Sequence, residues 1–191
     1  MAINLQKGGR IDIGLSRISI GLGWDPNGGT GHAFDLDASA FMLNEGKQIP
    51  AEEYFVFYGN IDSPDTALHH TGDDPTGGNS EGGDDETINV DLSKVNANIR
   101  EIIFVVTIHE ARSRKQNFGQ VRNSYIRILD EASGQEVAKY ELDEDFSIET
   151  SVEFGRLYKR EDQWKFEASG IGYNQELDFF VNKYYNGTVI K

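Results

Sequence analysis

The sequence predicts an all-β fold, a sandwich of two mainly antiparallel sheets with short peripheral helices and one long acidic loop. Apolar residues alternate with polar ones over about ten short segments, which is the period of half-buried strands. Helical periodicity is confined to short stretches, so the strands must bury their apolar faces against one another. The strand spacing is interrupted over residues 59–86, which favours a sandwich over an evenly wound barrel.

The first expected strands cover residues 11–15 and 18–22, which alternate on both sides of a break at Ser16 and Arg17. In the next, residues 34–40, apolar positions alternate with Asp35, Asp37 and Ser39. The remaining expected strands are 54–58, 87–92, 102–108, 125–129, 137–142, 151–158 and 164–170. The segment 102–108 is apolar on both faces, which is typical of a strand in the middle of a sheet.

Three segments have helical character, at residues 93–99, 110–117 and 177–185. The last has apolar residues at helical spacing and is the best candidate for a terminal helix. At about 150 residues per domain, the 191 residues predict one domain over 1–191, with 173–191 as a C-terminal extension in which a helix is expected.

The composition excludes several classes of function. Eighteen Lys and Arg against 32 Asp and Glu give a net charge of −14, which repels nucleic-acid phosphates and anionic lipid and favours cations. The chain has no cysteine, which excludes disulfides, thiolate metal sites and thiol redox chemistry by the chain itself. No signal core and no apolar run of about 18 residues occurs, so we expect a cytoplasmic protein without membrane insertion.

The most unusual segment is an acidic, glycine-rich loop at residues 70–86. Residues 73–86 carry six carboxylates, and no Lys or Arg occurs between Lys47 and Lys94. One interpretation is a solvated loop kept open by charge repulsion. The other is a site for a hard cation such as Ca²⁺, which binds 6–8 oxygens from carboxylates, carbonyls and water. Composition alone leaves both interpretations open.

Aspartates outside the loop favour the cation site. Asp35 and Asp37 are two positions apart on an expected strand, so they project from one face. That face continues in phase with Phe41 and Leu43, so it is not simply solvent-exposed. The candidate metal ligands are Asp25, Asp35, Asp37, Asp73, Asp74, Gly77, Asn79, Glu81, Asp84, Asp85 and Glu86. Their nine carboxylates favour two calcium ions, and their spacing does not fit an EF-hand.

Most of these residues lie within motifs that resemble the bacterial tellurium-resistance TerD family, from Leu5 to about Gly172. The matching segments are 5–9, 21–25, 34–40, 70–74, 83–86, 103–109, 117–121 and 164–166. The resemblance implies a calcium-binding β-sandwich, acting without catalysis in the cytoplasm within a multi-protein system for tellurite resistance and stress response. Its implied partners are calcium and other proteins of that system. Asp74 stands where the family often has Asn, and it keeps an oxygen donor there.

Two alternatives remain open from the residues alone. Paired carboxylates could serve a carbohydrate-active enzyme or another hydrolase. A carbohydrate site needs an aromatic cleft, for which Trp24, Phe118, Trp164 and Tyr173 are candidates. The basic cluster Arg112-Ser113-Arg114-Lys115 is either a solvated helix face or a contact for an acidic partner. If that partner is the acidic loop of a second copy, the chain would self-associate head to tail.

Overall fold

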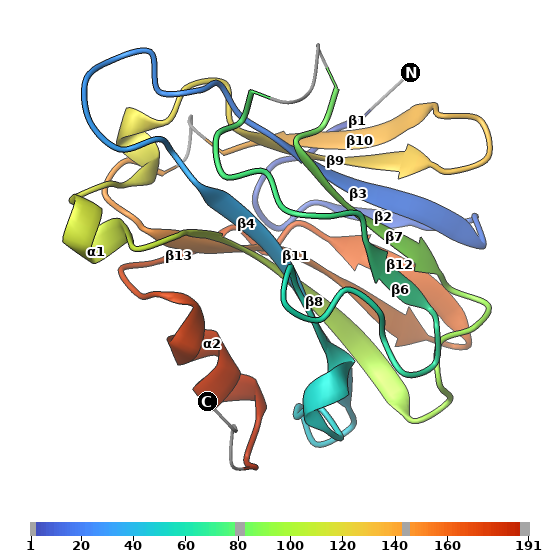
Figure 1. Ribbon diagram of the computed structural model, residues 1–191. Helices are drawn as coiled ribbons and strands as arrows, with labels where there is room; N and C mark the ends of the chain where they lie inside the picture. Colours follow the sequence, from blue (N-terminus) through green and yellow to red (C-terminus); the bar gives the residue numbers. More distant parts are fainter. Residues whose placement is uncertain (1–2, 79–82, 143–145, 188–191) are drawn as a thin grey trace.

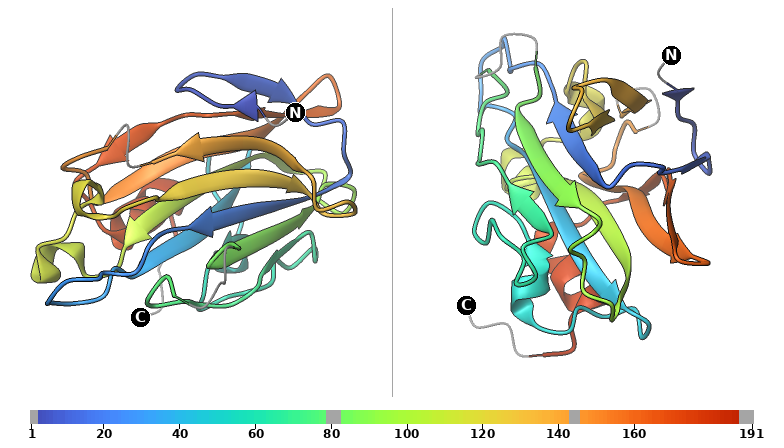
Figure 2. Two further views of the ribbon diagram at one scale, coloured as in Figure 1. Left: turned by 90° about the horizontal axis from the view of Figure 1, so that it is seen from above. Right: turned by 90° about the vertical axis from the view of Figure 1, so that its right-hand side faces the viewer.

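The computed structural model describes residues 3–78, 83–142 and 146–187, and it consists of two packed β-sheets with few helices (Figure 1). The first sheet contains, in spatial order, β1 (Ile3–Asn4), β10 (Glu136–Glu141), β9 (Tyr125–Asp130), β3 (Arg17–Gly23), β7 (Glu86–Asp91) and β6 (Leu68–His70). Its pairs are antiparallel except β1 with β10, and Figure 2 shows its strands from above. The predicted sandwich of two mainly antiparallel sheets is confirmed.

The second sheet contains, in order, β2 (Arg10–Asp12), β12 (Gln163–Glu167), β11 (Ser151–Arg160), β8 (Ile99–Ile108), β4 (Leu36–Asn44) and β5 (Phe55–Val56). In addition, β13 (Ile171–Tyr173) pairs with β11. The strand β8 lies between β4 and β11, as its apolar residues on both faces predict. The short helical elements are η1 (Glu52–Tyr54), α1 (Ala111–Arg114), η2 (Phe118–Gln120) and α2 (Leu177–Tyr184).

Two apolar layers hold the molecule together. The larger core lies between the sheets and takes one face of the longer strands, as Leu36 and Ala38 of β4 and Phe104 and Val106 of β8 illustrate. The other face of the second sheet forms a smaller core with α2, which lies on the side away from the first sheet (Figure 1). Its buried residues are Phe41, Leu43, Ile49, Phe55, Ile103, Val105, Phe180 and Tyr184. The outer face of β4 is therefore covered, as its sequence phase indicates.

Several strands are shorter than the alternation predicts. The ladder of β2 ends at Asp12, because the chain then crosses to the first sheet and begins β3 at Arg17. Ile13 and Leu15 still pack against the core without belonging to a strand. The strands β1, β6 and β13 were not predicted, since two or three residues are too few to show a period. No helix among the described residues has the length and apolar character needed to cross a bilayer.

Candidate metal centre

Three aspartates converge at the end of the second sheet where β4 begins. Asp35 precedes β4, Asp37 is its second residue, and Asp73 comes from the segment that follows β6. Each offers a carboxylate oxygen, and these oxygens lie within 4.8 Å of one another. Asp37 and its cross-strand partner Thr107 share the outer face of the sheet, and Asp37 is only 3% exposed. Within the described residues this is the one such cluster of three or more potential ligands.

The cluster carries more negative charge than its surroundings neutralise. Burial, together with the nearby carboxylates of Glu86, Asp35 and Asp73, raises the pKa of Asp37 to about 8. Burial also raises the pKa of Asp35, although His109 and Arg114 act in the opposite direction. A cation bound here would be favourable, because its charge offsets the desolvation of these carboxylates and their mutual repulsion.

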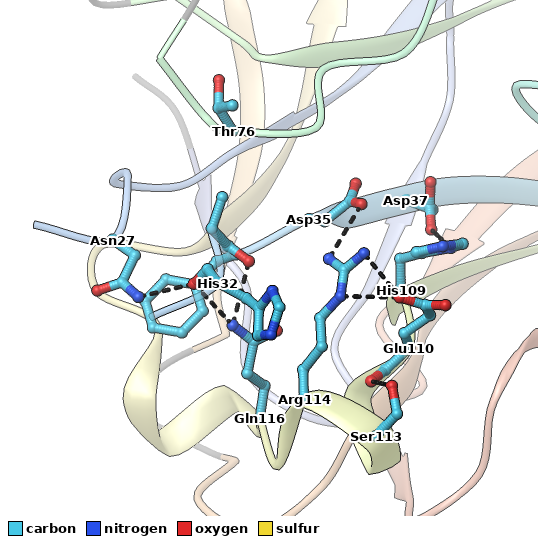
Figure 3. A network of polar contacts seen from close by, with 12 residues as sticks. Asn27, His32, Asp35, Asp37, Thr76, His109, Glu110, Ser113, Arg114 and Gln116 are labelled. Carbon is cyan, nitrogen blue, oxygen red and sulfur yellow. Dashed lines mark hydrogen bonds and ion pairs between the residues drawn. The ribbon is translucent and has the colours of Figure 1, made fainter. Parts of the chain in front are cut away.

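The cation that the chain itself places here is Arg114 of α1. Its Nη1 lies 3.4 Å from Asp35 Oδ2, and its Nη2 lies 2.9 Å from Glu110 Oε2. Figure 3 shows the Arg114 side chain extending from α1 toward Asp35, with Asp37 and His109 beside it. Left-handed backbone at Glu110 (φ 52°) and Lys115 (φ 55°) bounds α1 at both ends. Arg114 therefore contacts this chain's own acidic cluster, a role that sequence reasoning missed.

Glu86 lies beside the cluster but is held by the backbone. It is 1% exposed; its Oε2 accepts a hydrogen bond from the Ala38 N–H at 2.7 Å, and its Oε1 accepts one from the Asp74 N–H at 3.3 Å. The Nε2 of buried His70 lies 3.5 Å from Glu86 Oε2. Through these two hydrogen bonds Glu86 links the backbone of the acidic segment to β4, next to Asp37 and Asp73.

Asp74, Asp85 and Gly77 also shape the loop. Asp74 Oδ1 accepts hydrogen bonds from the N–H groups of Thr76 at 2.9 Å and Gly77 at 3.1 Å, and Asp85 Oδ2 accepts one from the Trp24 N–H at 2.9 Å. Gly77 has a positive φ of 69° and lies against the Trp24 ring. A Cβ added at this position would come within 2.3 Å of the indole nitrogen. These contacts fold the loop over Trp24.

The other predicted ligands lie apart from the three-aspartate cluster. Asp84 Oδ1 accepts hydrogen bonds from Arg127 Nε at 2.7 Å and from the Tyr125 hydroxyl at 3.1 Å, on the outer face of the first sheet. Asp25 Oδ2 accepts one from Asn123 Nδ2 at 2.6 Å. Asn79 and Glu81 are outside the described residues.

Two of the four aromatic residues that could line a carbohydrate cleft are buried and do not line one. Trp24 and Phe118 are buried in the core between the sheets, and the Trp24 indole N–H donates to the Phe34 carbonyl at 3.0 Å. Trp164 is partly buried against the same core, and Tyr173 packs beside α2. The positions of these side chains favour a packing role.

Comparison with known proteins gives one consistent result. A family model described as "TerD domain" matches residues 1–184. The chain is 44% identical over 190 residues to "General stress protein 16U" of Bacillus subtilis, covering 96% of this chain and 97% of that protein. It is 43% identical over 178 residues to "Tellurium resistance protein TerD" of Serratia marcescens, covering 91% of this chain and 92% of that protein.

Solved structures show the same fold at lower identity. A crystal structure from Streptomyces coelicolor, described as a homologue of telluride resistance protein (TerD), aligns with a TM-score of 0.72 and 20% identity. The alignment covers 88% of this chain and 96% of that chain. A protein described as of unknown function aligns with a TM-score of 0.75, 22% identity and the same coverage.

Proposed function

The chain belongs to the TerD family of tellurium-resistance and stress proteins, and from this premise we propose that it is a non-enzymatic, calcium-dependent binding module of the cytoplasm. In this proposal it acts on tellurite resistance or stress indirectly, through other proteins of a multi-protein system. The observation that carries the proposal is the convergence of Asp35, Asp37 and Asp73, with oxygens within 4.8 Å and one carboxylate almost fully buried.

The donor set suits calcium better than other common metals. Three carboxylates offer up to six oxygens, and calcium takes 6–8 oxygen ligands in flexible geometry, with backbone carbonyls and water completing the set. Magnesium requires tighter octahedral geometry and gives up its water reluctantly. The cluster contains no sulfur ligand, so a soft metal gains little there.

We propose one ion at this cluster, held by Asp35, Asp37 and Asp73. A second ion stays a prediction, because Asn79 and Glu81 lie outside the described residues and Asp84 is engaged by Arg127 and Tyr125. Glu86 acts in this proposal by fixing the backbone of Ala38 and Asp74, since both its oxygens accept hydrogen bonds from those N–H groups.

Isothermal titration of the full chain with CaCl₂ and with MgCl₂ tests the proposal. We expect calcium to bind and magnesium to bind more weakly. Asp73→Asn removes one ligand charge from an exposed position and should weaken calcium binding at least about tenfold, in line with the loss of a charged partner. Asp62→Asn is the matched control, because Asp62 is an exposed aspartate outside the cluster, with His69 as its ion-pair partner. Equal loss in both variants, or equal affinity for both metals, would contradict the proposal.

A further inference from the structure

We propose that the cavity between α1 and the start of α2 binds an aliphatic polyamine, a ligand whose ammonium groups are joined by methylene chains. The cavity has a volume of about 560 Å³ and lies over the outer face of the second sheet, where Asp37 joins it to the three-aspartate cluster. This volume is within the range of about 300–1,000 Å³ that is usual for small-molecule sites. The site goes beyond the proposed function and does not depend on bound calcium.

Most charged groups of the cavity are acidic. Four carboxylates line it, against the one guanidinium of Arg112, and they belong to Asp37, Glu110, Glu176 and Asp178. Glu110 is paired with Arg114. Within the described parts of the chain neither Glu176 nor Asp178 forms an ion pair, since each side chain accepts a hydrogen bond only from a backbone N–H. The net charge of −14 adds to this local excess, so the cavity favours a cationic ligand.

A buried hydroxyl in the cavity wall is an independent sign of a ligand. Thr107 lines the cavity as the cross-strand neighbour of Asp37 and is 2% exposed. Among the described residues its Oγ1 has no hydrogen-bond partner, which costs free energy at a buried position. An ammonium group has three N–H donors and no acceptor. It can therefore donate to Thr107 Oγ1 and to a carboxylate at the same time.

The remaining wall suits the methylene chains of the ligand. Tyr58, Ile108 and Leu177 line the cavity, and Tyr58 is 40% exposed. An ammonium group is attracted to the face of an aromatic ring, and methylene groups gain free energy when they leave water for an apolar surface. A metal ion has no apolar part. A chain of methylenes with several ammonium groups therefore matches the combination of carboxylates, aromatic ring and apolar side chains.

Two positive charges oppose such a ligand, and both provide tests. Arg112 is exposed and lines the cavity, so its guanidinium repels an ammonium group and its removal should strengthen binding. A calcium ion on Asp35, Asp37 and Asp73 would take Asp37 from the ligand and add positive charge beside it. Calcium should therefore weaken polyamine binding.

Calorimetry on the full chain, freed of calcium by chelation and dialysed into metal-free buffer, tests the site with spermidine as the probe and hexanediol as the uncharged control. Sodium chloride at about 0.15 M screens long-range attraction. We expect spermidine to bind and hexanediol not to bind. Glu176→Gln keeps the oxygen that accepts the Arg112 N–H but removes a charge, and it should weaken spermidine binding about threefold or more. Asp62→Asn is the matched control, because Asp62 is an exposed aspartate that does not line the cavity.

Two further variants sharpen the test. Thr107→Val should weaken spermidine binding about threefold or more without loss of stability, because it removes an unpaired buried hydroxyl. Arg112→Gln should strengthen spermidine binding about threefold. Weaker binding in Arg112→Gln, or unchanged binding in Thr107→Val, would overturn the proposed site.

The outcomes also separate this site from the metal centre. If calcium does not bind the unaltered chain, the proposed function fails, while the calcium-free titration still decides on the polyamine. No binding of spermidine, or equal losses in Glu176→Gln and Asp62→Asn, would overturn the polyamine site, the second result indicating only diffuse attraction to an acidic surface. Calcium that binds without weakening spermidine binding would place the amine elsewhere and overturn it as well.

Discussion

Replacing Asp37 by Asn should stabilise the ion-free protein and abolish its stabilisation by calcium. Burial and neighbouring carboxylates raise the pKa of Asp37 from 3.8 to about 8, so the folded state holds its proton more tightly than the unfolded state. The stability of the ion-free protein should therefore fall as pH rises from about 4 to about 8, by about 1.4 kcal/mol per pH unit. At pH 7 this cost is on the order of 4 kcal/mol, and Asn, which carries no charge, avoids it.

Urea denaturation followed by tryptophan fluorescence measures the effect. In EDTA at pH 7, Asp37→Asn should unfold at higher urea than the unaltered protein, and its stability should depend less on pH. With calcium at about 100 times its dissociation constant, the unaltered protein gains about 2.7 kcal/mol and the variant gains almost nothing. Asp62 has a side chain that is 63% exposed, so Asp62→Asn should change neither the stability in EDTA nor the gain from calcium. A variant that is less stable than the parent in EDTA at pH 7 would refute the reasoning.

Three further predictions follow from the same contacts. Arg114→Gln should raise calcium affinity about tenfold, because it removes a cation facing Asp35, and a calorimetric loss of affinity would mean that Arg114 instead holds Asp35 in place. Asp84→Ala should lower the free energy of unfolding, measured in urea, by about 2–3 kcal/mol, because Arg127 and Tyr125 lose their partner. Its calcium affinity should not change, and loss of calcium binding would place Asp84 in a metal site. Chelation should raise hydrogen exchange at residues 72–78 and at Asp35 and Asp37 but not in β8, whereas global unfolding in EDTA would show that the ion is structural.

The fold was predictable from the sequence to the extent that strand alternation survives in three dimensions. The phase of Phe41 and Leu43 correctly indicated that the outer face of β4 is covered. The partner of that face, α2, follows from its apolar spacing, but where it docks depends on long-range packing. Strands of two or three residues, such as β1 and β6, carry no periodic signal.

The candidate site was predictable only in outline. Composition identified the acidic loop, but adjacent acids point to different sides of an extended chain, so Asp73 meets Asp35 and Asp37 while Asp74 turns to its own backbone. The role of Arg114 required the tertiary fold, since 79 positions separate it from Asp35. The one available signal was a cluster of three cations in a chain of net charge −14.

The docking of α2 on the second sheet has a consequence for synthesis of the chain. The apolar face formed by Phe41, Leu43, Ile103 and Val105 is complete once β4 and β8 have left the ribosome, but its cover is Phe180 and Tyr184 of α2. Until α2 emerges, the nascent chain exposes this face together with Glu153, which later accepts hydrogen bonds from Lys183 and the Tyr184 hydroxyl. We therefore expect the nascent chain to be prone to aggregation through this apolar face until the last helix folds onto the sheet.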